Sequence, residues 1–589
     1  MCGIVACFAE ENCYGKLLAA LARLEYRGYD SAGIALLSAG GLSVRKRAGG
    51  VRNLAGPPLE GDTGIGHTRW ATHGAPTDVN AHPHVCGKFA LVHNGIVENF
   101  AQLKAELCAH GETFLSDTDS EVIVHLIARA YEGDFFAAVA AACRRLRGSY
   151  AIAVLCADCP GEIVCARSGS PLVAGYAGGA LYVCSDAPAL GEGARFCAAQ
   201  DGEFIRISGG VIRFCDADGR EIPKTFSRSS DDRCADAPDA GSFMEREIGQ
   251  IPAALSRTLE GLRDFDFAPC ARAMRGAKNV FAVACGSALH AALAFKDAAE
   301  CEAGVPVLCF AASEFRCRAP LAGRGDLVVA VSQSGETADT LGAVRLARSR
   351  GAYVLAVTNV AHSSLAAEAD LVVPMRAGPE VAVAATKSYN CQLLCLYYIA
   401  AQLCYYRNDR FPAYFGELFR LPEGARAAFS AFPAAEGIAR AFRDAPAMYF
   451  IGRGGEARTA AEGALKVKEI AYLFSEGLPA GELKHGPLAL VEEGFPVVAL
   501  STSRALLPKM AGALAEVKAR GARVALLSQF EEVLADPAVD FPVRLPALCE
   551  RLMPVLSVIP LQYLACRLCL LRGFDPDRPR NLAKSVTVE

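Results

Sequence analysis

The sequence lacks an uninterrupted apolar run long enough to cross a lipid bilayer. Its longest apolar stretch, residues 393–406, is interrupted by Gln402 and is shorter than the ~18–20 residues that a membrane-spanning helix needs. The first residues carry no basic segment, and Glu10 and Glu11 come too early for a secretory signal peptide. We therefore expect a cytoplasmic protein with no membrane partner, in which residues 393–406 form a buried helix.

The chain also lacks a strong net charge. Its formal net charge is −4 and its isoelectric point is about 6.3, so no basic surface for nucleic acid is indicated. The one notable basic run, Arg45-Lys46-Arg47, is expected to be a solvated loop. We expect no nucleic-acid partner.

The 24 cysteines do not form a zinc-binding pattern. Two pairs have CxxC spacing, Cys156 with Cys159 and Cys566 with Cys569, but neither is followed by a second Cys or His pair. The other cysteines lie mostly in apolar segments, as in reduced intracellular proteins. We expect no metal site, and Cys566 and Cys569 should face the core of a helix.

The 589 residues are enough for about three to five domains. Short apolar runs separated by Gly, Pro and Asp predict a β-rich region over residues 2–215, with two helices near 15–24 and 120–131. The predicted strands are residues 89–93, 150–156, 162–167, 180–184 and 204–207. Residues 216–242 are polar and rich in turn-forming residues, which indicates a linker.

The rest of the chain contains an internal repeat. Gly286 precedes Ser332 by 46 residues, and Gly454 precedes Ser501 by 47 residues, in matching glycine- and serine-rich segments. Both copies alternate apolar strands with helices, a pattern typical of a doubly wound parallel sheet. The fold class is therefore α/β, with two copies of one domain after the β-rich region.

The first copy contains a hydroxyl-rich loop after a predicted strand. Ser332, Gln333, Ser334 and Thr337 offer three hydroxyls and an amide without a Lys or Arg, which suits a phosphomonoester at a helix N-terminus. The alternative is an ordinary helix cap, because Ser and Thr favour that position in any helix.

The second residue of the chain is a candidate nucleophile. Removal of Met1 would leave Cys2 with a free α-amine, whose pKa of ~7.7–8.0 allows it to act as base for its own thiol. The alternative is an inert buried cysteine. Asn94-Gly95 is either a hairpin turn or an oxyanion hole made from an amide and a main-chain N–H.

Two further residues in the β-rich region have the charges that an amino-acid substrate requires. Arg69 could hold an α-carboxylate and Asp119 an α-ammonium group, which favours a substrate such as glutamine. In the second repeat, Glu462, Lys466 and Glu469 fall on one face of a helix predicted over residues 458–472. They form either an exposed ion-pair stripe or, with His485, a site for carbonyl and enol chemistry.

With these residues in place, the chain closely resembles glutamine–fructose-6-phosphate aminotransferases (isomerizing), the glucosamine-6-phosphate synthases. The resemblance covers nearly the whole chain in family order. It rests on Cys-Gly-Ile-Val at 2–5, Arg-Trp-Ala-Thr-His-Gly at 69–74, Ser-Gln-Ser-Gly-Glu-Thr at 332–337, Glu-Gly-Ala-Leu-Lys at 462–466 and the last eleven residues, 579–589.

The resemblance implies an N-terminal nucleophile amidotransferase domain, an αββα sandwich, followed by two sugar-isomerase domains. The implied boundaries are 2–215 for the amidotransferase, 216–242 for the linker, 271–410 and 439–575 for the isomerase domains, and 576–589 for a tail that closes the sugar site. It also implies a homodimer that uses glutamine and fructose 6-phosphate, needs no cofactor and carries ammonia between its sites to make glucosamine 6-phosphate, the first committed step of amino-sugar synthesis.

The resemblance also implies roles for single residues. Cys2 is the nucleophile, with Asn94 and Gly95 as its oxyanion hole. Trp70, the only tryptophan, gates the ammonia channel. The implied glutamine-binding residues are Arg69, Thr72, His73 and Asp119; the sugar-phosphate ligands are Ser287, Ser332, Gln333, Ser334 and Thr337; and the isomerase residues are Glu469 (base), Lys466 (its neighbour), His485 (ring opening) and Lys584 (Schiff base).

The chain departs from the family pattern at two positions. Ala288 and Ala385 stand where the family carries hydroxyl residues, so either fructose 6-phosphate binds through the remaining groups or the preferred sugar phosphate differs. A sensor without catalysis and a substrate-shifted relative of the isomerases are the open alternatives. The acidic loop of an amidophosphoribosyltransferase and the pyrophosphate loop of an asparagine synthetase are not found; Ser208-Gly209-Gly210 only begins like the latter.

Overall fold

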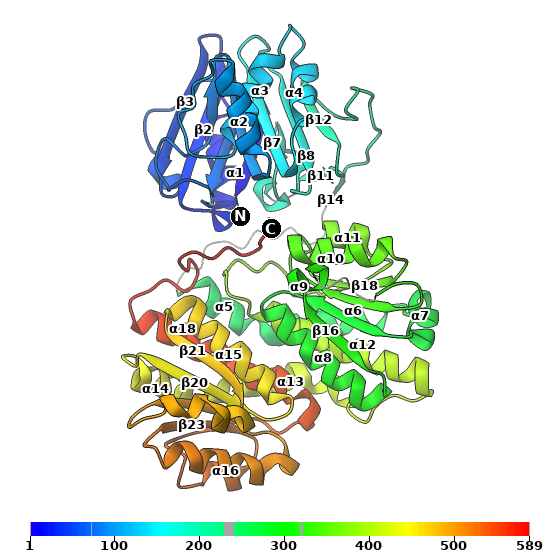
Figure 1. Cartoon of the computed structure of the whole chain (residues 1–589), viewed down its shortest axis with the longest axis vertical. Coiled ribbons are helices and arrows are strands. Elements are labelled where there is room, and N and C mark those ends of the chain that lie inside the picture. The colour runs from blue at the N-terminus through cyan, green and yellow to red at the C-terminus, as the bar shows by residue number, and fades with distance from the viewer. Residues whose placement is uncertain (1, 72, 192, 229–240, 318–321, 588–589) are drawn as a thin grey trace. The chain divides into compact units, whose positions relative to one another are not determined.

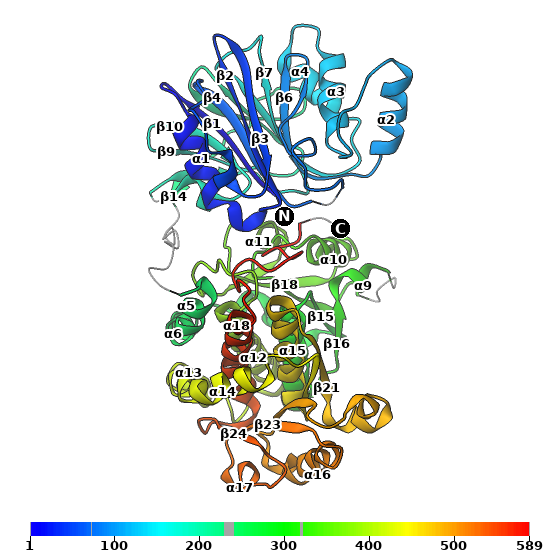
Figure 2. The same cartoon turned by 90° about the vertical axis from the view of Figure 1, so that its left-hand side faces the viewer.

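The computed structural model describes residues 2–71, 73–191, 193–228, 241–317 and 322–587 (Figures 1 and 2). The chain divides into two compact units. The first comprises Met1–Cys234 together with Ala583–Glu589, and the second comprises Ala235–Leu582. We describe each unit by itself.

The N-terminal unit contains two mainly antiparallel sheets. The first has the strand order β14-β11-β9-β10-β1-β4-β2-β3 and the second β13-β12-β8-β7-β6-β5. The strands are β1 Gly3–Ala9, β2 Ser31–Ser38, β3 Gly41–Ala48, β4 Thr63–Arg69, β5 His84–Cys86, β6 Phe89–Val97, β7 Gly148–Cys156, β8 Ile163–Ser168, β9 Val173–Ala177, β10 Ala180–Cys184, β11 Arg195–Ala198, β12 Phe204–Ser208, β13 Val211–Cys215 and β14 Ser227–Arg228.

The two sheets pack face to face, and successive side chains along a strand point alternately toward and away from the interface between them. On β1, Ile4 and Ala6 enter a core between the sheets, while Val5 and Cys7 face outward into a second core that packs against α1. The outer face of the second sheet packs against α3 and α4 in the same way. The helices are α1 Tyr14–Arg23, α2 Phe100–Ala109, α3 Glu121–Ala130 and α4 Phe135–Cys143. The expected αββα sandwich and the five predicted strands are confirmed.

Two predictions of loops in this unit were wrong. The basic run 45–47 lies inside β3, the edge strand of its sheet, where charged side chains are common because the edge faces water. Asn94 and Gly95 form no hairpin turn: they lie within β6, where they pair with Ala151 and Tyr150 of β7. Helices α2 and α4 were not predicted.

The second unit confirms the repeat. Each half holds a five-stranded parallel sheet with one order, β16-β15-β17-β18-β19 in the first and β21-β20-β22-β23-β24 in the second. The first-half strands are β15 Val280–Ala284, β16 Val307–Ala311, β17 Leu327–Val331, β18 Tyr353–Thr358 and β19 Leu371–Pro374; the second-half strands are β20 Ala447–Gly452, β21 Phe474–Pro479, β22 Pro496–Leu500, β23 Arg523–Ser528 and β24 Phe541–Arg544.

Helices cover these sheets and join the two halves. They are α5 Phe243–Gly249, α6 Ile251–Arg263, α7 Ala271–Gly276, α8 Ser287–Ala303, α9 Ala312–Cys317, α10 Ala338–Ser349, α11 Ser364–Glu368, α12 Lys387–Asn408, α13 Leu421–Ala428, α14 Phe432–Phe442, α15 Glu456–Ala471, α16 Leu507–Lys518, α17 Glu531–Leu534 and α18 Met553–Leu571. One continuous apolar core runs from α5 through α8, α12 and α15 to α18, so both repeats share it.

The two long apolar helices of this unit are core helices. The expected buried helix over 393–406 is part of α12, whose residues from Lys387 to Ala401 are all buried. The sequence analysis overlooked a second segment, Glu550–Leu571, which is long and apolar enough to span a membrane but has 78% of its most apolar window buried inside the protein. Cys566 and Cys569 lie in this helix and are buried, as predicted.

Candidate active sites

The thiol of Cys2 lies at the start of β1, next to the end of β4. The main-chain N–H of Trp70 donates a hydrogen bond to Cys2 Sγ at 3.2 Å. Burial of the sulfur raises the pKa of the Cys2 thiol, an effect that the nearby Arg69 and Arg27 guanidinium groups oppose. A thiol in this position needs a local base before it can attack a substrate.

A side-chain amide stands beside this thiol. Asn94 Nδ2 donates to the main-chain oxygen of Cys2 at 2.9 Å, and Asn94 Oδ1 lies 3.0 Å from His67 Nε2. The same His67 nitrogen lies 3.0 Å from the oxygen of His93, so a protonated Nε2 donates to both acceptors and fixes the orientation of the amide. The structure thus brings Asn94 to Cys2, and His67 is a positioning residue that the sequence analysis missed.

Gly95 follows Asn94 in a conformation that excludes a side chain. Its φ is +135°, and a Cβ there would lie 2.0 Å from the main-chain oxygen of Ser149. Only glycine fits at this position, and Gly95 directly follows the Asn94 amide, with which it is expected to form the oxyanion hole.

The residues expected to bind glutamine lie around one short loop. Arg69 is buried, and its guanidinium donates to the main-chain oxygens of His73, Gly74 (2.9 Å) and Ala75 (3.2 Å). Asp119 accepts from the N–H of Val97 at 2.8 Å, and its other oxygen lies 3.9 Å from His73 Nδ1. Arg69, His73 and Asp119 are thus brought together. The guanidinium of Arg69 binds main-chain carbonyl oxygens of the loop and so fixes the shape of the loop.

Two other residues were predicted in this region. Thr72 lies outside the described residues. Trp70 is half-buried, and its ring packs edge-on against Tyr29 with a centroid distance of 6.0 Å. The main chain of Trp70 therefore contacts the nucleophile, while its side chain packs against Tyr29.

In the second unit, the predicted phosphate loop lies at the switch point of the first sheet. Strand β15 is paired with β16 on one side and β17 on the other, and Ala284 and Val331 are opposite each other at their carboxyl ends. The loops that follow these two strands therefore begin side by side, each leading to the N-terminus of a helix, α8 or α10. Ligands of open α/β sheets bind at such a point.

The loop itself is held by its own hydroxyls. Ser332 Oγ lies 2.9 Å from Thr337 Oγ1 and accepts from the N–H of Gly335 at 3.1 Å. Gly335 has a φ of +67°, and a Cβ there would lie 2.1 Å from Ser363 Oγ. Gln333 and Ser334 belong to the same loop and are half-buried. The loop brings four of the five predicted phosphate ligands together.

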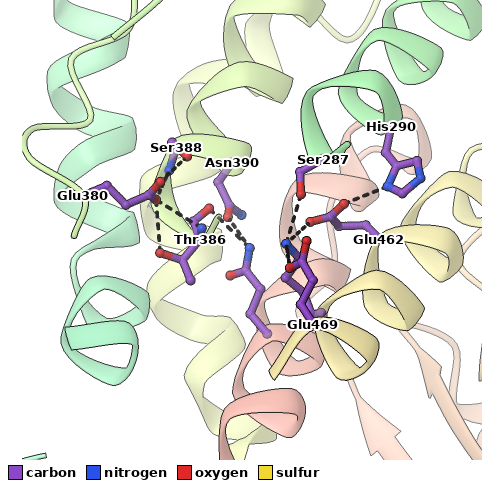
Figure 3. A network of polar contacts seen from close by, with 10 residues as sticks. Ser287, His290, Glu380, Thr386, Ser388, Asn390, Glu462 and Glu469 are labelled. Carbon is purple, nitrogen blue, oxygen red and sulfur yellow. Dashed lines mark hydrogen bonds and ion pairs between the residues drawn. The ribbon is translucent and has the colours of Figure 1, made fainter. Parts of the chain in front are cut away.

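The fifth, Ser287, belongs to a buried charged cluster (Figure 3). Lys466 Nζ donates to Ser287 Oγ at 3.0 Å and lies 2.6 Å from Glu469 Oε2 and 3.3 Å from Glu462 Oε1. His290 Nδ1, one turn along α8, lies 2.7 Å from Glu462 Oε2. The expected stripe on one face of α15 therefore faces the protein interior, so the reading of an exposed ion-pair stripe was wrong.

The pairing controls the charges of this cluster. Burial alone would lower the pKa of Lys466, but Glu462 and Glu469 raise it above its ordinary value. Burial would likewise raise the pKa of Glu462, but Lys466 and then His290 hold it below its ordinary value. Lys466 is thus a fixed cation between Glu462 and Glu469, and Glu469 is the more exposed of these two carboxylates.

Two predicted isomerase residues are not joined to this cluster by the described contacts. His485 ends a 3-10 helix, Ala480–His485, and is exposed. Lys584 belongs to residues 583–589, which group with the N-terminal unit. The roles of His485 and Lys584 stay predictions.

A second polar network, which the sequence analysis missed, supports the start of α12 (Figure 3). Glu380 accepts hydrogen bonds from the N–H of Thr386 at 3.1 Å and from the N–H and hydroxyl of Ser388 at 2.9 and 2.6 Å. Asn390 Oδ1 accepts from Gln562 of α18 at 3.1 Å. This network holds the segment that carries Ala385. A carboxylate six residues before a Thr-Lys-Ser run was the only signal for it in the sequence.

Comparison with family models identifies each part of the chain. Residues 67–192 match the model of the glutamine amidotransferase domain, and residues 273–401 and 441–572 each match the model of the SIS domain. The αββα sandwich is therefore an amidotransferase domain, and the two parallel-sheet halves are SIS domains.

Curated relatives that match over their full length have the same name. The glutamine–fructose-6-phosphate aminotransferase (isomerizing) of Symbiobacterium thermophilum is 44% identical, and that of Mycolicibacterium smegmatis 42% identical, over 100% of both chains in each comparison. The solved C-terminal domain of glucosamine-fructose-6-phosphate aminotransferase from Francisella tularensis is 33% identical with a TM-score of 0.55, covering 58% of this chain and 99% of that one.

Proposed function

The chain belongs to the family of glutamine–fructose-6-phosphate aminotransferases (isomerizing), and from this premise we propose that it makes glucosamine 6-phosphate from fructose 6-phosphate and glutamine. The observation that carries the proposal is the Cys2 thiol beside the Asn94 amide, in one chain with the buried cluster of Lys466 and Glu469. The first group suits acyl transfer and the second suits movement of a proton on a sugar.

In the amidotransferase domain, Cys2 attacks the side-chain amide of glutamine. The α-amine of a processed Cys2 takes the thiol proton, and the negative charge that develops on the amide oxygen is stabilised by Asn94 Nδ2 and the N–H of Gly95. Collapse of the tetrahedral intermediate releases ammonia and leaves a thioester. Water then releases glutamate and restores the thiol.

In the isomerase unit, the loop of Ser332 holds the phosphate of the open-chain ketose, at the N-termini of α8 and α10. The Lys584 amine and the sugar carbonyl form an imine with loss of water, and ammonia then displaces the Lys584 amine, so that the sugar carries the transferred nitrogen. Glu469 moves a proton between the first two carbons, and Lys466, held between Glu462 and Glu469, fixes the position of the Glu469 carboxylate. His485 assists ring opening.

Three finer features belong to the same proposal. Ammonia passes between the two sites without entering bulk water, where most of it would be protonated, and Trp70 gates its exit. The chain acts as a homodimer in the cytoplasm, and His485 acts from the neighbouring subunit. The exposure of the His485 side chain supports this arrangement.

Substitution of the nucleophile tests the two half-reactions separately. We expect Cys2→Ala to abolish glutamate formation while conversion of fructose 6-phosphate, with ammonium salt in place of glutamine, continues. Intact mass of the active wild-type protein should correspond to a chain beginning at Cys2. Full activity with Met1 retained would contradict the α-amine mechanism, and glutamine-dependent synthesis by Cys2→Ala would contradict the nucleophile.

A further inference from the structure

Three potential metal ligands meet on the outer side of the six-stranded sheet of the amidotransferase domain. Cys86 ends the edge strand β5, Glu112 follows α2, and His125 lies in α3. Cys86 Sγ is 3.5 Å from His125 Nδ1, and Glu112 Oε2 is 2.9 Å from the same nitrogen. The three ligand atoms all lie within 4.8 Å of one another, and among the described residues this is the one such group.

We propose that Cys86, Glu112 and His125 bind a zinc-class transition-metal ion. A tetrahedral ion with Zn–S about 2.3 Å and Zn–N and Zn–O about 2.0–2.1 Å holds sulfur and nitrogen about 3.6 Å apart, and nitrogen and oxygen about 3.3 Å apart. The spacings in the structure are 3.5 and 2.9 Å, so small side-chain movements suffice. Thiolate and imidazole ligands favour zinc over magnesium or calcium.

The surroundings support a bound ion. The other ring nitrogen of His125, Nε2, lies 3.8 Å from Glu121 Oε1, so a movement of under about 1 Å would form the carboxylate–histidine hydrogen bond that orients metal-binding imidazoles. The ring of Phe114 covers His125 with a centroid distance of 4.5 Å. Glu112 is 32% exposed, so an ion and a fourth ligand, water, can reach the site from solvent.

The site would be coupled to the glutamine site through Glu121. The Glu121 carboxylate accepts hydrogen bonds from the N–H groups of Leu115 and Ser116 at 2.9 and 2.7 Å. This loop leads directly to Asp119, which faces His73. An ion that joins β5, α2 and α3 would therefore stiffen the segment carrying Asp119, a role distinct from the chemistry at Cys2.

No motif in the sequence indicates this site, because its ligands come from three separate elements. Neither CxxC pair contributes to it, and no interval of two to five residues joins Cys86, Glu112 and His125.

Titration of the metal-free full-length protein with Co²⁺ tests the proposal. We expect about one ion per chain, with a thiolate-to-cobalt charge-transfer absorption that Zn²⁺ removes and Mg²⁺ leaves unchanged. Cys86→Ala should abolish this absorption, and Glu112→Gln should weaken Co²⁺ binding at least about tenfold. Cys108→Ala, which removes an exposed cysteine of α2, should leave both unchanged.

A second measurement separates loss of the site from loss of folding. Zn²⁺ should raise the thermal midpoint of the wild-type and Cys108→Ala proteins but not that of Cys86→Ala, whose circular dichroism should stay that of the wild type. Equal charge-transfer absorption in Cys86→Ala and wild type would overturn the proposal. The absence of thiolate absorption in the wild type would also overturn the proposal, because no ion would then be bound through Cys86.

Discussion

At the scale of single residues, the most informative contact is the one between Lys466 and Glu469. Both lie on α15, three residues apart, and Nζ and Oε2 are 2.6 Å apart. Lys466 is fully buried, whereas the side chain of Glu469 is 21% exposed. Lys466 is therefore held as a cation, and Glu469 is the carboxylate of the pair that is partly open to solvent.

Glu469→Gln keeps the shape of the side chain but removes its basicity. We expect glucosamine 6-phosphate synthesis to fall by about 10²–10⁴-fold, because a positioned base typically contributes that much. Glutamate formation by the same protein should continue. Glu476→Gln, an exposed matched change on β21, should leave both rates near wild type. Synthesis within a few-fold of wild type in Glu469→Gln would mean that another group moves the proton.

Ala288 tests whether a missing hydroxyl changes the sugar-phosphate site. It follows Ser287 in the first turn of α8, and Ser287 itself accepts a hydrogen bond from Lys466. A hydrogen bond to a charged group contributes about 1.5–3 kcal/mol, or roughly ten- to a hundredfold in affinity. The Ser332 loop already offers several donors. We therefore expect Ala288→Ser to strengthen fructose 6-phosphate binding by no more than about tenfold.

Binding of fructose 6-phosphate to wild type and Ala288→Ser, measured by calorimetry, checks this expectation. Ala292→Ser, one turn further along α8, controls for a hydroxyl added to the helix. A gain well beyond tenfold, or faster turnover of another ketose phosphate, would show that the two alanines define a different specificity.

At the scale of elements, four buried histidines join the two sheets beside the nucleophile. His67 on β4 stacks on His82 with a centroid distance of 4.1 Å, and His82 lies edge-on to His84 of β5 at 4.4 Å. Burial lowers the pKa of His67 and of His84 to about 3, and it also lowers the pKa of His82 and His93. All four are therefore neutral at pH 7.

These neutral histidines make the amidotransferase domain sensitive to acid. Because an unfolded histidine has a pKa of about 6.5, the unfolded chain gains protons below that pH while the folded histidines do not. For His67 and His84, this contribution to the free energy of unfolding is fully present above pH 6.5 and is lost as the pH falls toward 3, at about 1.4 kcal/mol per pH unit for each.

Replacing one histidine should make this dependence shallower. His84→Gln keeps a hydrogen-bonding partner for Thr118, whose hydroxyl lies 3.1 Å from His84 Nε2, but cannot titrate. We expect the free energy of unfolding in urea to fall less between pH 6.5 and 5 for His84→Gln than for wild type. The slope of this free energy against pH should correspond to about one proton fewer taken up on unfolding. His110→Gln, at an exposed position, should behave as wild type. Parallel curves for all three proteins would mean that His84 is protonated in the fold.

Much of this fold could be predicted because its strands are short apolar runs with clear boundaries, and because the repeat spacing is preserved from β15 to β24. Helices α2 and α4 could not: the first has only a weak apolar face, and the second is apolar nearly all round. Asn94-Gly95 reads locally as a turn, but pairing with β7 decides its conformation. Ser287, the partner of Lys466, and His290, the partner of Glu462, both lie on α8 more than 170 residues away, so no local pattern indicates these contacts.

At the scale of the whole molecule, the proposed function assigns glutamine hydrolysis to one unit and sugar amination to the other, so the rates of the two half-reactions can be compared. The Trp70 side chain can be removed without touching the main-chain N–H that contacts Cys2. We expect Trp70→Ala to form glutamate near the wild-type rate while less ammonia reaches the sugar. The molar ratio of glutamate to glucosamine 6-phosphate should rise above one, and Trp70→Phe, which keeps an aromatic ring, should raise it less. A ratio that stays at one in Trp70→Ala would exclude a gate.

The core shared by the two SIS domains has a consequence for how this chain can evolve. Residues of α8 and α12 from one copy and of α15 and α18 from the other bury one another, so neither copy can be cut out without exposing a large apolar surface. The two copies are therefore joined into a single unit of inheritance. Shuffling of gene segments can exchange the pair as a whole but cannot exchange one half alone.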